Sequence, residues 1–215
     1  MKRIIVLAMM VTTMMTVLAQ KEIGTFTVYP RVGMNLSKFS GQKIYYDASD
    51  NYVKEKYKMG LSAGAELWYQ FHNSLALSAG LIESGQGTKW EKIILPEYRD
   101  KEGKMARDEY SISMSTQMLN IPLLLHAFVA PGLSFEVGVQ PGFLLSAKNK
   151  MNDEEGDMKS LMKTFDLSIP IGISYEYMNI QLDLRYNYGL TSLGDFFDKG
   201  HNRSFVLTLG YGIDF

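Results

Sequence analysis

The stretch SFVLTLGYGIDF, Ser204–Phe215, decides the fold. From Phe205 onward, large apolar side chains occupy every second position, and small or polar side chains such as Ser204 and Thr208 occupy the positions between them. A period of two puts alternate side chains on opposite faces of a β-strand. The stretch is therefore predicted to be a strand with one large apolar face and one small or polar face.

The same alternation recurs along most of the chain. It is regular in four further segments and looser in three more: 61–71, 133–145, 165–177 and 180–190, then 26–36, 75–87 and 113–129. In the segment 75–87, Glu83 falls on the apolar parity, which indicates either a β-bulge or a strand that has left the apolar zone. Each of the eight segments approaches or exceeds the roughly 9–11 residues with which a tilted strand crosses a bilayer.

Short and long connections alternate between these segments. The short turns lie around Asn73, Pro131-Gly132 and Asn179, and the long charged connections span about 37–56, 89–112, 148–162 and 191–203. In an up-and-down meander all short turns then lie at one end, together with both termini, which is the arrangement of outer-membrane barrels. The predicted fold class is all-β: an eight-stranded antiparallel up-and-down transmembrane β-barrel of the outer-membrane type.

Alternation alone does not say which face is inside, because a soluble lipocalin-like barrel also alternates, with its apolar face inward. Lysine distinguishes the two, since no lysine lies in the central part of any predicted strand, whereas a solvated outer wall would carry many. The polar face is rich in small residues, which suit the narrow lumen of an eight-stranded barrel. The apolar face is therefore expected to meet lipid, with aromatic residues gathered near both ends of the strands.

The first nineteen residues have the pattern of a secretory signal peptide. Lys2 and Arg3 precede an apolar run that begins at Ile4, and Ala19 offers a small residue for cleavage. The apolar run is shorter than the roughly 20 residues of a spanning helix, which disfavours an N-terminal anchor. We expect a signal peptide at 1–19, an outer-membrane β-barrel domain at 20–215, and location in the outer membrane.

Composition excludes several classes of function. The chain has 215 residues and no Cys, so disulfides, thiol catalysis, Cys-ligated zinc and an N-terminal lipid on Cys are ruled out. A net charge of -1 gives no reason to expect nucleic acid as a partner.

Catalytic and metal-binding patterns are weak. The three histidines, His72, His126 and His201, lack metal-ligand spacing. His201 with Ser204 and Asp198 leaves a hydrolase as an alternative, although a histidine in a polar loop is usually solvated. The acidic run 153–157 could attract Ca²⁺ but lacks the EF-hand spacing. We expect no cofactor, no metal and no catalytic residues.

The inward-facing charges form the most informative group. Six charged residues have inward parity: Arg31, Glu66, Glu136, Glu176, Asp183 and Arg185. A charge in a low-dielectric lumen needs a partner. We expect a structural salt-bridge network in which Arg31 faces Glu66, and Arg185 lies against Glu176 or Glu136. The functional alternative is a proton or ion path, for which an eight-stranded barrel leaves little room.

Several motifs resemble the PorT-like outer-membrane β-barrel family, which is common in Bacteroidetes. The matching segments are VGMNLS at 32–37, SGQG at 84–87, LNIPLLL at 119–125, GVQPGFLLSA at 138–147 and LRYNYGL at 184–190. The sequence departs at Asn120 and Gly80, where the family often has an acid, and at Glu83, where an aromatic is common. The resemblance implies a barrel fold and outer-membrane location, and some members of the family are linked to protein secretion.

Function is expected to lie in contacts rather than in chemistry. Phe215, which closes an alternating strand, is similar to the signal read by the outer-membrane barrel assembly machinery. The expected partners are outer-membrane lipid, that machinery during biogenesis, and other envelope or secretion proteins. The alternatives are a small-ligand or lipid-binding barrel and a lipid-modifying outer-membrane enzyme.

Overall fold

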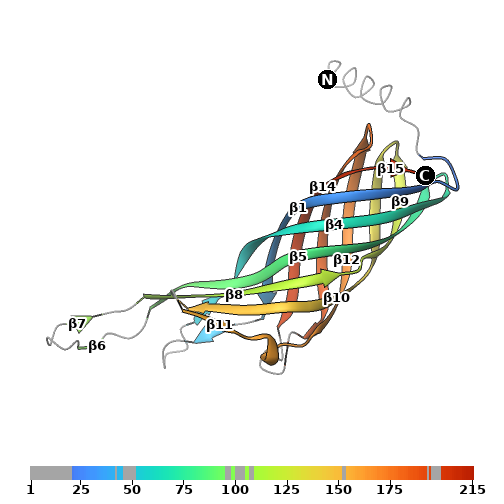
Figure 1. Ribbon diagram of the computed structural model, residues 1–215. Coiled ribbons are helices and arrows are strands. Elements are labelled where there is room, and N and C mark those ends of the chain that lie inside the picture. Colours follow the sequence, from blue (N-terminus) through green and yellow to red (C-terminus); the bar gives the residue numbers. More distant parts are fainter. Residues whose placement is uncertain are drawn as a thin grey trace, which may run out of the picture.

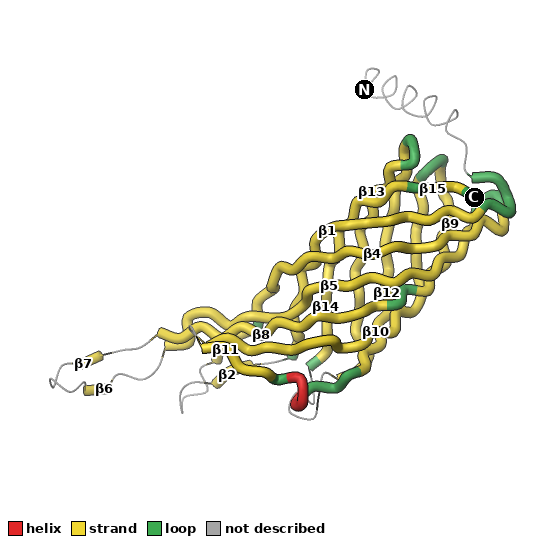
Figure 2. The backbone as a smooth tube through the Cα atoms, viewed as in Figure 1, coloured by secondary structure: helices red, strands yellow, loops and turns green. Residues whose placement is uncertain are grey.

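A computed structural model describes most of the chain beyond the predicted signal peptide. The described residues are 21–41, 43–45, 52–94, 98–99, 105–106, 109–151, 154–192, 194 and 200–215. The predicted signal peptide, 1–19, lies outside them. Strands make up nearly all of the described chain (Figure 2). Within these ranges no helix is both long enough and apolar enough to span a membrane.

Long antiparallel strands form a closed ring. They are β1 (Phe26–Ser40), β4 (Lys56–His72), β5 (Leu75–Ile94), β8 (Glu109–Asn120), β9 (Leu123–Ala130), β10 (Leu133–Met151), β12 (Phe165–Tyr177), β13 (Ile180–Ser192) and β14 (His201–Tyr211). The order is β10-β12-β13-β14-β1-β4-β5, and β8 and β9 each pair with both β5 and β10. With β8 and β9 counted as one interrupted strand, the ring has the predicted eight strands. Neighbouring strands in the ring are antiparallel, which confirms the all-β, up-and-down architecture.

Short elements complete the two ends. β15 (Ile213–Asp214) continues β14 along β1. The long connections lie at one end of the barrel and contain short strands of their own. β2 (Lys43–Tyr45) pairs with β3 (Tyr52–Lys54), and β6 (Tyr98–Arg99) pairs with β7 (Met105–Ala106). The third long connection contains β11 (Glu154–Asp157) and a 3₁₀ turn at Lys159–Leu161. The short turns and the C-terminus lie at the opposite end (Figure 1). We call the two ends the short-turn end and the loop end.

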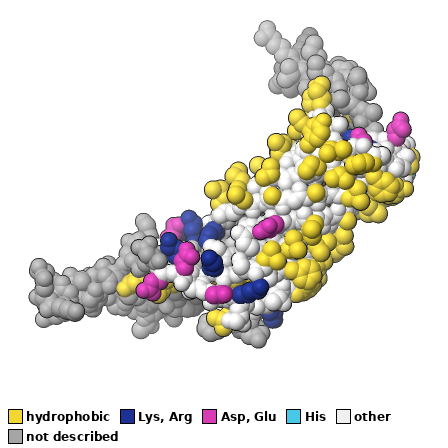
Figure 3. All heavy atoms as spheres, viewed as in Figure 1, with side chains coloured by type: hydrophobic (Ala, Val, Ile, Leu, Met, Phe, Trp, Pro, Cys, Tyr) yellow, Lys and Arg dark blue, Asp and Glu magenta, His cyan; other side chains and the backbone are white. Residues whose placement is uncertain are grey.

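The apolar face of the strands points outward, as predicted. Leu207 and Leu209 are 39% and 53% exposed, whereas Thr208 between them is 4% exposed. Apolar side chains cover much of the barrel wall that Figure 3 shows, and charged side chains gather mainly toward its ends. Because the exposed wall is apolar and the buried face is polar, lipid suits the outside of this barrel better than water does.

Several strands run further toward the loop end than the sequence predicts, and three of them, β5, β8 and β10, continue together beyond the barrel. β5 ends at Ile94 rather than near Gly87, and β10 ends at Met151 rather than near Leu145. Both pair with an earlier-starting β8, so that Ile112 is opposite Trp90 on one side and Met151 on the other. The connections predicted as loops therefore contain a β-extension that projects from the barrel (Figure 1). We define the extension as 89–94, 109–114, 146–151 and β11.

The predicted strand 113–129 is wrong as a continuous element, because it breaks at Ile121-Pro122. Proline has no backbone N–H and cannot donate to the ladder. The break is hydrogen-bonded, since the Pro122 carbonyl accepts from Gly80 N at 2.9 Å and Ile121 N donates to the Pro141 carbonyl at 2.8 Å.

Glu83 faces outward in unbroken register. It pairs opposite Ala63 on β4 and Leu119 on β8. The nearest register shift between β4 and β5 comes later, between the Ser62 and Tyr57 pairings. A bulge therefore does not account for the position of Glu83 on the apolar parity.

Candidate functional site

The interior of the barrel holds a cluster of buried charges, which we call the charge layer. Alternation turns Arg31, Glu66 and Glu136 inward from β1, β4 and β10, and turns Asp183 and Arg185 inward from β13. None of these five side chains exposes more than 6% of its surface. The layer therefore lies in the low-dielectric interior, where unpaired charges are costly.

Arg185 lies at the centre of the charge layer. Its Nη1 is 2.5 Å from Glu66 Oε1, and its Nη2 is 2.5 Å from Asp183 Oδ2. Its Nε donates to Glu136 Oε1. One guanidinium thus joins carboxylates from three strands, which uses the planar set of donors that only arginine offers.

Arg31 connects two of the same carboxylates from another side. Its Nη1 is 2.9 Å from Asp183 Oδ2 and 3.3 Å from Glu66 Oε1. Its Nη2 donates to Gln181 Oε1 at 2.5 Å. The structure thus places Arg31 against Glu66, and Arg185 against Glu136 rather than Glu176.

His126 completes the charge layer, and sequence reasoning did not include it there. Its Nδ1 is 3.2 Å from Glu136 Oε2, its Nε2 hydrogen-bonds Ser78 Oγ at 2.8 Å, and its ring stacks on Trp68 with centroids 3.6 Å apart. His126 is fully buried and has the inward parity of its strand, so the sequence alone can indicate a lumen position for it. Contact with Glu136 depends on the register between β9 and β10, which the sequence does not reveal.

Glu176 lies outside the charge layer, which corrects its expected membership. It pairs opposite Gln181, close to the turn at Met178-Asn179, and is therefore nearer the short-turn end than Arg185. Its Oε2 accepts a hydrogen bond from the Tyr29 hydroxyl at 2.5 Å, and its Oε1 is 3.0 Å from Lys21 Nζ.

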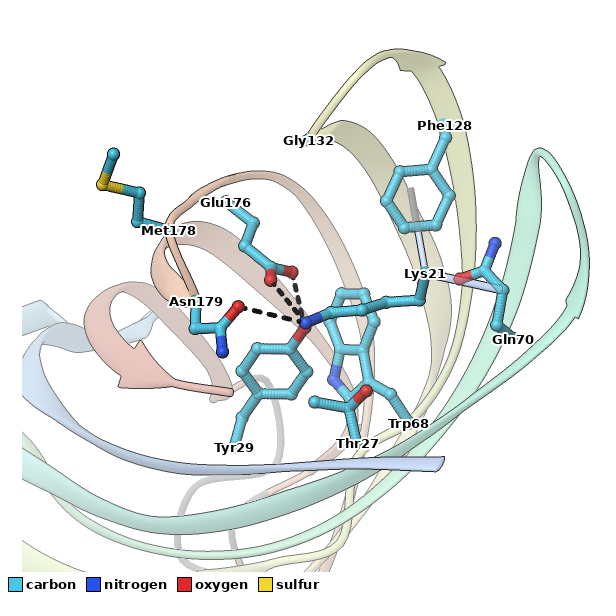
Figure 4. A pocket seen from close by; sticks show the side chains of 10 residues that line it. All are labelled: Lys21, Thr27, Tyr29, Trp68, Gln70, Phe128, Gly132, Glu176, Met178 and Asn179. Carbon is cyan, nitrogen blue, oxygen red and sulfur yellow. Dashed lines mark hydrogen bonds and ion pairs between the residues drawn. The ribbon is translucent and has the colours of Figure 1, made fainter. Parts of the chain in front are cut away.

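The short-turn end is filled by aromatic side chains. Tyr29, Trp68 and Ala76 form a buried apolar cluster against which Phe128 packs. The Tyr29 and Trp68 ring centroids are 5.1 Å apart. Figure 4 shows the Tyr29 and Trp68 rings below the point where Lys21 meets Glu176. The Tyr29 and Trp68 rings therefore lie between the charge layer and the opening of the barrel at the short-turn end.

The loop end is closed by a second apolar cluster, which we call the loop-end cluster. Its buried members are Phe39, Trp90, Ile93, Met114, Met118, Leu144, Ala147 and Met162. They come from the ends of β1, β5, β8 and β10 and from the connection after β11. This packing explains why the strands continue into the extension, since inward positions there bury apolar rather than polar side chains.

This arrangement favours a sealed interior over a channel. The cavity beside Arg31, Glu66 and Arg185 measures about 20 Å³, which is room for about one water molecule. Within the described ranges, no group of three or more His, Asp or Glu side chains has an arrangement that could hold a metal ion. The charges of the layer are engaged with one another, so their arrangement suits cross-barrel stabilisation.

The described members of the two other candidate sites contact groups outside those sites. His201 Nδ1 contacts the Thr191 carbonyl at 3.1 Å, while Ser204 is buried and accepts from Asn187 Nδ2 at 3.2 Å. Asp198 lies outside the described residues, as does Asp153 of the acidic run. The remaining acids of that run lie in the exposed β11, where Glu155 is 3.9 Å from Lys148.

Phe215 lies beside the first strand. Its backbone N donates to the Phe26 carbonyl at 2.8 Å, and its side chain is 80% exposed. The end of the chain thus extends the β14–β1 seam, with the ring outside the barrel.

Comparisons with known proteins agree with this architecture. A family model described as the outer membrane protein β-barrel domain matches residues 18–195. No curated protein sequence matches the chain significantly.

Solved structures with similar chains include two bacterial proteins and a designed protein. Ail, the attachment invasion locus protein of Yersinia pestis, has 15% identity and a TM-score of 0.45, over 89% of this chain and 100% of Ail. Neisserial surface protein A has 14% identity and a TM-score of 0.41, over 89% and 99%. A de novo designed transmembrane β-barrel has 15% identity and a TM-score of 0.37, over 90% and 99%. These similarities are too low to carry a function over to this chain.

Proposed function

The chain belongs to the outer membrane protein β-barrel domain family, and from that premise we propose that it is a non-catalytic barrel whose extension contacts other envelope proteins. We further propose that it is of the PorT-like, secretion-associated type that its motifs resemble. In this proposal residues 1–19 are removed as a signal peptide, and 20–215 form the mature barrel. Phe215 is read by the barrel assembly machinery, and the short turns face the periplasm.

The observation that carries the proposal is the ordered β-extension at the loop end. The strands there are fixed by cross-strand pairing as far as Met151 opposite Ile112, and the loop-end cluster packs beneath them. A surface that is already ordered loses less conformational entropy on binding than a mobile loop would. Such a surface is suited to recognising a protein partner.

The outer edge of the extension offers a specific contact. β11 pairs with β10 along one side, and among the described strands it has no neighbour on its other side. An exposed edge can accept a further strand, with main-chain hydrogen bonds providing affinity. Glu154 and Glu155 make this edge acidic and exposed, which favours a partner strand bearing basic side chains.

The small space beside the charge layer also supports the proposal. The charge layer is sealed at both ends by apolar side chains, and the cavity beside it has room for about one water molecule. A substrate or transported ion would have to displace paired buried charges, which is costly. Contact through the outside of the barrel is the simpler use of this fold.

Site-specific photocrosslinking in living cells tests the proposal. A photoreactive amino acid at Glu155, on the β11 edge, should capture one or a few defined envelope proteins, identified by mass spectrometry. The matched control places the same group at Leu207, on the lipid-facing wall, where those proteins should not be captured. Secretion components at Glu155 would support the PorT-like assignment. Equal capture at both positions, or only bound lipid in the purified barrel, would contradict the interaction role.

A further inference from the structure

The short-turn end carries a small built pocket, which we call the mouth. It has a volume of about 120 Å³ and is walled by Tyr29, Trp68 and Phe128. Polar groups of Glu176 and Asn179 lie at its rim (Figure 4). An apolar wall beside a carboxylate suits an alkylammonium group, whose methylenes can lie on the wall while its charged end meets the carboxylate.

The side chain of Lys21 already occupies the polar side of the mouth. Its Nζ is 3.0 Å from Glu176 Oε1, 2.9 Å from Asp214 Oδ2 and 3.4 Å from Asn179 Oδ1. In Figure 4 the aliphatic stem extends across the opening and the ammonium ends beside Glu176. The chain's own lysine therefore shows which chemical group the mouth accepts.

Glu176 is held in place independently of Lys21. The Tyr29 hydroxyl donates to Glu176 Oε2 at 2.5 Å, so the other oxygen remains directed at the ammonium. The backbone of Asn179, in the turn between β12 and β13, is also held, because its carbonyl accepts a hydrogen bond from Gly212 N at 2.7 Å. Removing the lysine side chain should thus leave a preformed acceptor set rather than a collapsed one.

Lys21 can leave the mouth without unfolding the strand that follows it. The segment before β1 is held by main-chain hydrogen bonds from Gly24 N to the Gln70 carbonyl and from Gln70 N to the Thr25 carbonyl, at 2.7 and 3.0 Å. Rotation of the Lys21 side chain breaks none of these bonds. Withdrawal of the Lys21 ammonium would leave the carboxylates of Glu176 and Asp214 without their cation, which favours binding of another cation there.

We propose that the mouth is a binding site for a primary alkylammonium group, closed by Lys21 in the resting protein and open to an external lysine side chain when Lys21 withdraws. The external ligand places its methylenes on Trp68 and Phe128 and its ammonium between Glu176 and Asn179. The site is at the opposite end of the barrel from the β-extension. An experiment that contradicts this site therefore leaves the proposed interaction role untouched, and the reverse also holds.

Chemical rescue of a Lys21→Ala variant tests the site. We expect the variant to have a lower Tm than the wild type in detergent, and n-butylammonium to raise that Tm saturably. N-butanol, which has the same chain without the charge, should not raise it. The wild type should bind n-butylammonium roughly tenfold or more weakly, because only the fraction with an open mouth is competent. Nα-acetyl-lysine amide should rescue as well, since the proposed natural ligand is a lysine side chain.

Trp68 provides a direct readout of occupancy. The chain contains two tryptophans, so a Trp90→Phe background isolates the Trp68 fluorescence. Its emission should shift with n-butylammonium in Lys21→Ala at the same midpoint as the Tm rescue. Lys148→Ala, which removes an exposed lysine at the loop end, is the matched control and should show no response.

Removing an acceptor decides the outcome. Adding Glu176→Gln to Lys21→Ala should abolish both responses. If that double variant fails to assemble, Asp214→Asn replaces Glu176→Gln, because Asp214 is at the exposed rim and its loss should weaken binding several-fold. Unchanged affinity in the assembled double variant, or equal rescue by n-butanol, would overturn the proposal.

Discussion

Arg185 on β13 lies 2.5 Å from Glu66 on β4, although β14 and β1 separate these two strands in the sheet. The ion pair therefore crosses the interior rather than following the wall. Asp183 and Glu136 contact the same guanidinium. Opposite sides of the barrel are thus joined through one arginine, and the ring of backbone hydrogen bonds is supported from inside.

A double-mutant cycle should detect this coupling. Breaking one side of a buried ion pair typically costs about 3–5 kcal/mol, and water in the lumen would reduce that value. Glu66→Gln and Arg185→Met should each lower the free energy of unfolding in detergent. The double variant should cost less than the sum of the two, because each single change leaves the other group unpaired.

An exposed pair serves as the control for that cycle. Lys148 and Glu155 are 3.9 Å apart, with both side chains more than half exposed. Glu155→Gln should change stability by about 1 kcal/mol or less. Strict additivity of Glu66→Gln and Arg185→Met would contradict the cross-barrel contact.

The barrel should not conduct. The interior is closed by Tyr29 and Trp68 at one end and by the loop-end cluster at the other. Purified protein in planar bilayers should therefore give no large steady current. Porin-like openings in the wild type would show that the interior is open in the membrane.

The loop-end cluster should support the extension more than the barrel. Trp90→Ala removes a buried aromatic side chain and should cost about 3–5 kcal/mol locally. Limited proteolysis should then cut the extension faster, while the barrel remains resistant and heat-modifiable on gels. Phe143→Ala, on the exposed wall, is the matched control. Equal protection of the extension in both variants would show that the cluster does not order it.

The mouth should give a defined pH dependence. Partial burial disfavours the charged form of Asp214, but hydrogen bonds from Thr27 and Lys21 hold its pKa below the usual 3.8. Burial also disfavours the charge on Lys21, yet Asp214 and Glu176 hold its pKa above the usual 10.5. Because the pKa of Asp214 is lowered in the folded protein, its carboxylate contributes stability above pH 3.8, and this stability is lost as pH falls through the folded pKa. Because the pKa of Lys21 is raised in the folded protein, its ammonium contributes stability below pH 10.5, and this stability is lost as pH rises through the folded pKa.

Comparison of the wild type with Lys21→Met isolates that contribution. The difference in Tm between the wild type and Lys21→Met should be constant from pH 3.8 to pH 10.5. It should shrink below pH 3.8 and above pH 10.5. Added salt should reduce it, because the contacts lie at a partly exposed rim. A difference that persists unchanged at pH 3 would contradict the contact between Lys21 and Asp214.

The sequence predicted the wall of this barrel well because alternation is a local property. Phe205, Leu207 and Leu209 point outward as their spacing requires, and Thr208 between them points into the interior. The break at Pro122 was missed because apolar residues on both faces hid it. The extension was missed because charges such as Lys89 and Glu91 alternate there with inward Trp90, which resembles a loop.

Contacts across the interior were harder to predict than positions on the wall. Arg31, Glu66 and Arg185 could be assigned to the inside from parity alone. The positions of these side chains along the barrel axis depend on the tilt and stagger of the strands, which the sequence does not reveal. For this reason Glu176 was grouped with Arg185, although its partners are Tyr29 and Lys21.

Spin-label accessibility along β14 tests the central claim most directly. The chain has no native Cys, so single cysteines at Leu207, Thr208 and Leu209 can be labelled one at a time in lipid vesicles. The inside-out alternation predicts high collision rates with lipid-dissolved oxygen at 207 and 209, and low rates at 208. Equal rates at the three positions, or higher access for a water-soluble nickel reagent at 207 and 209, would contradict a barrel with its apolar face in the membrane.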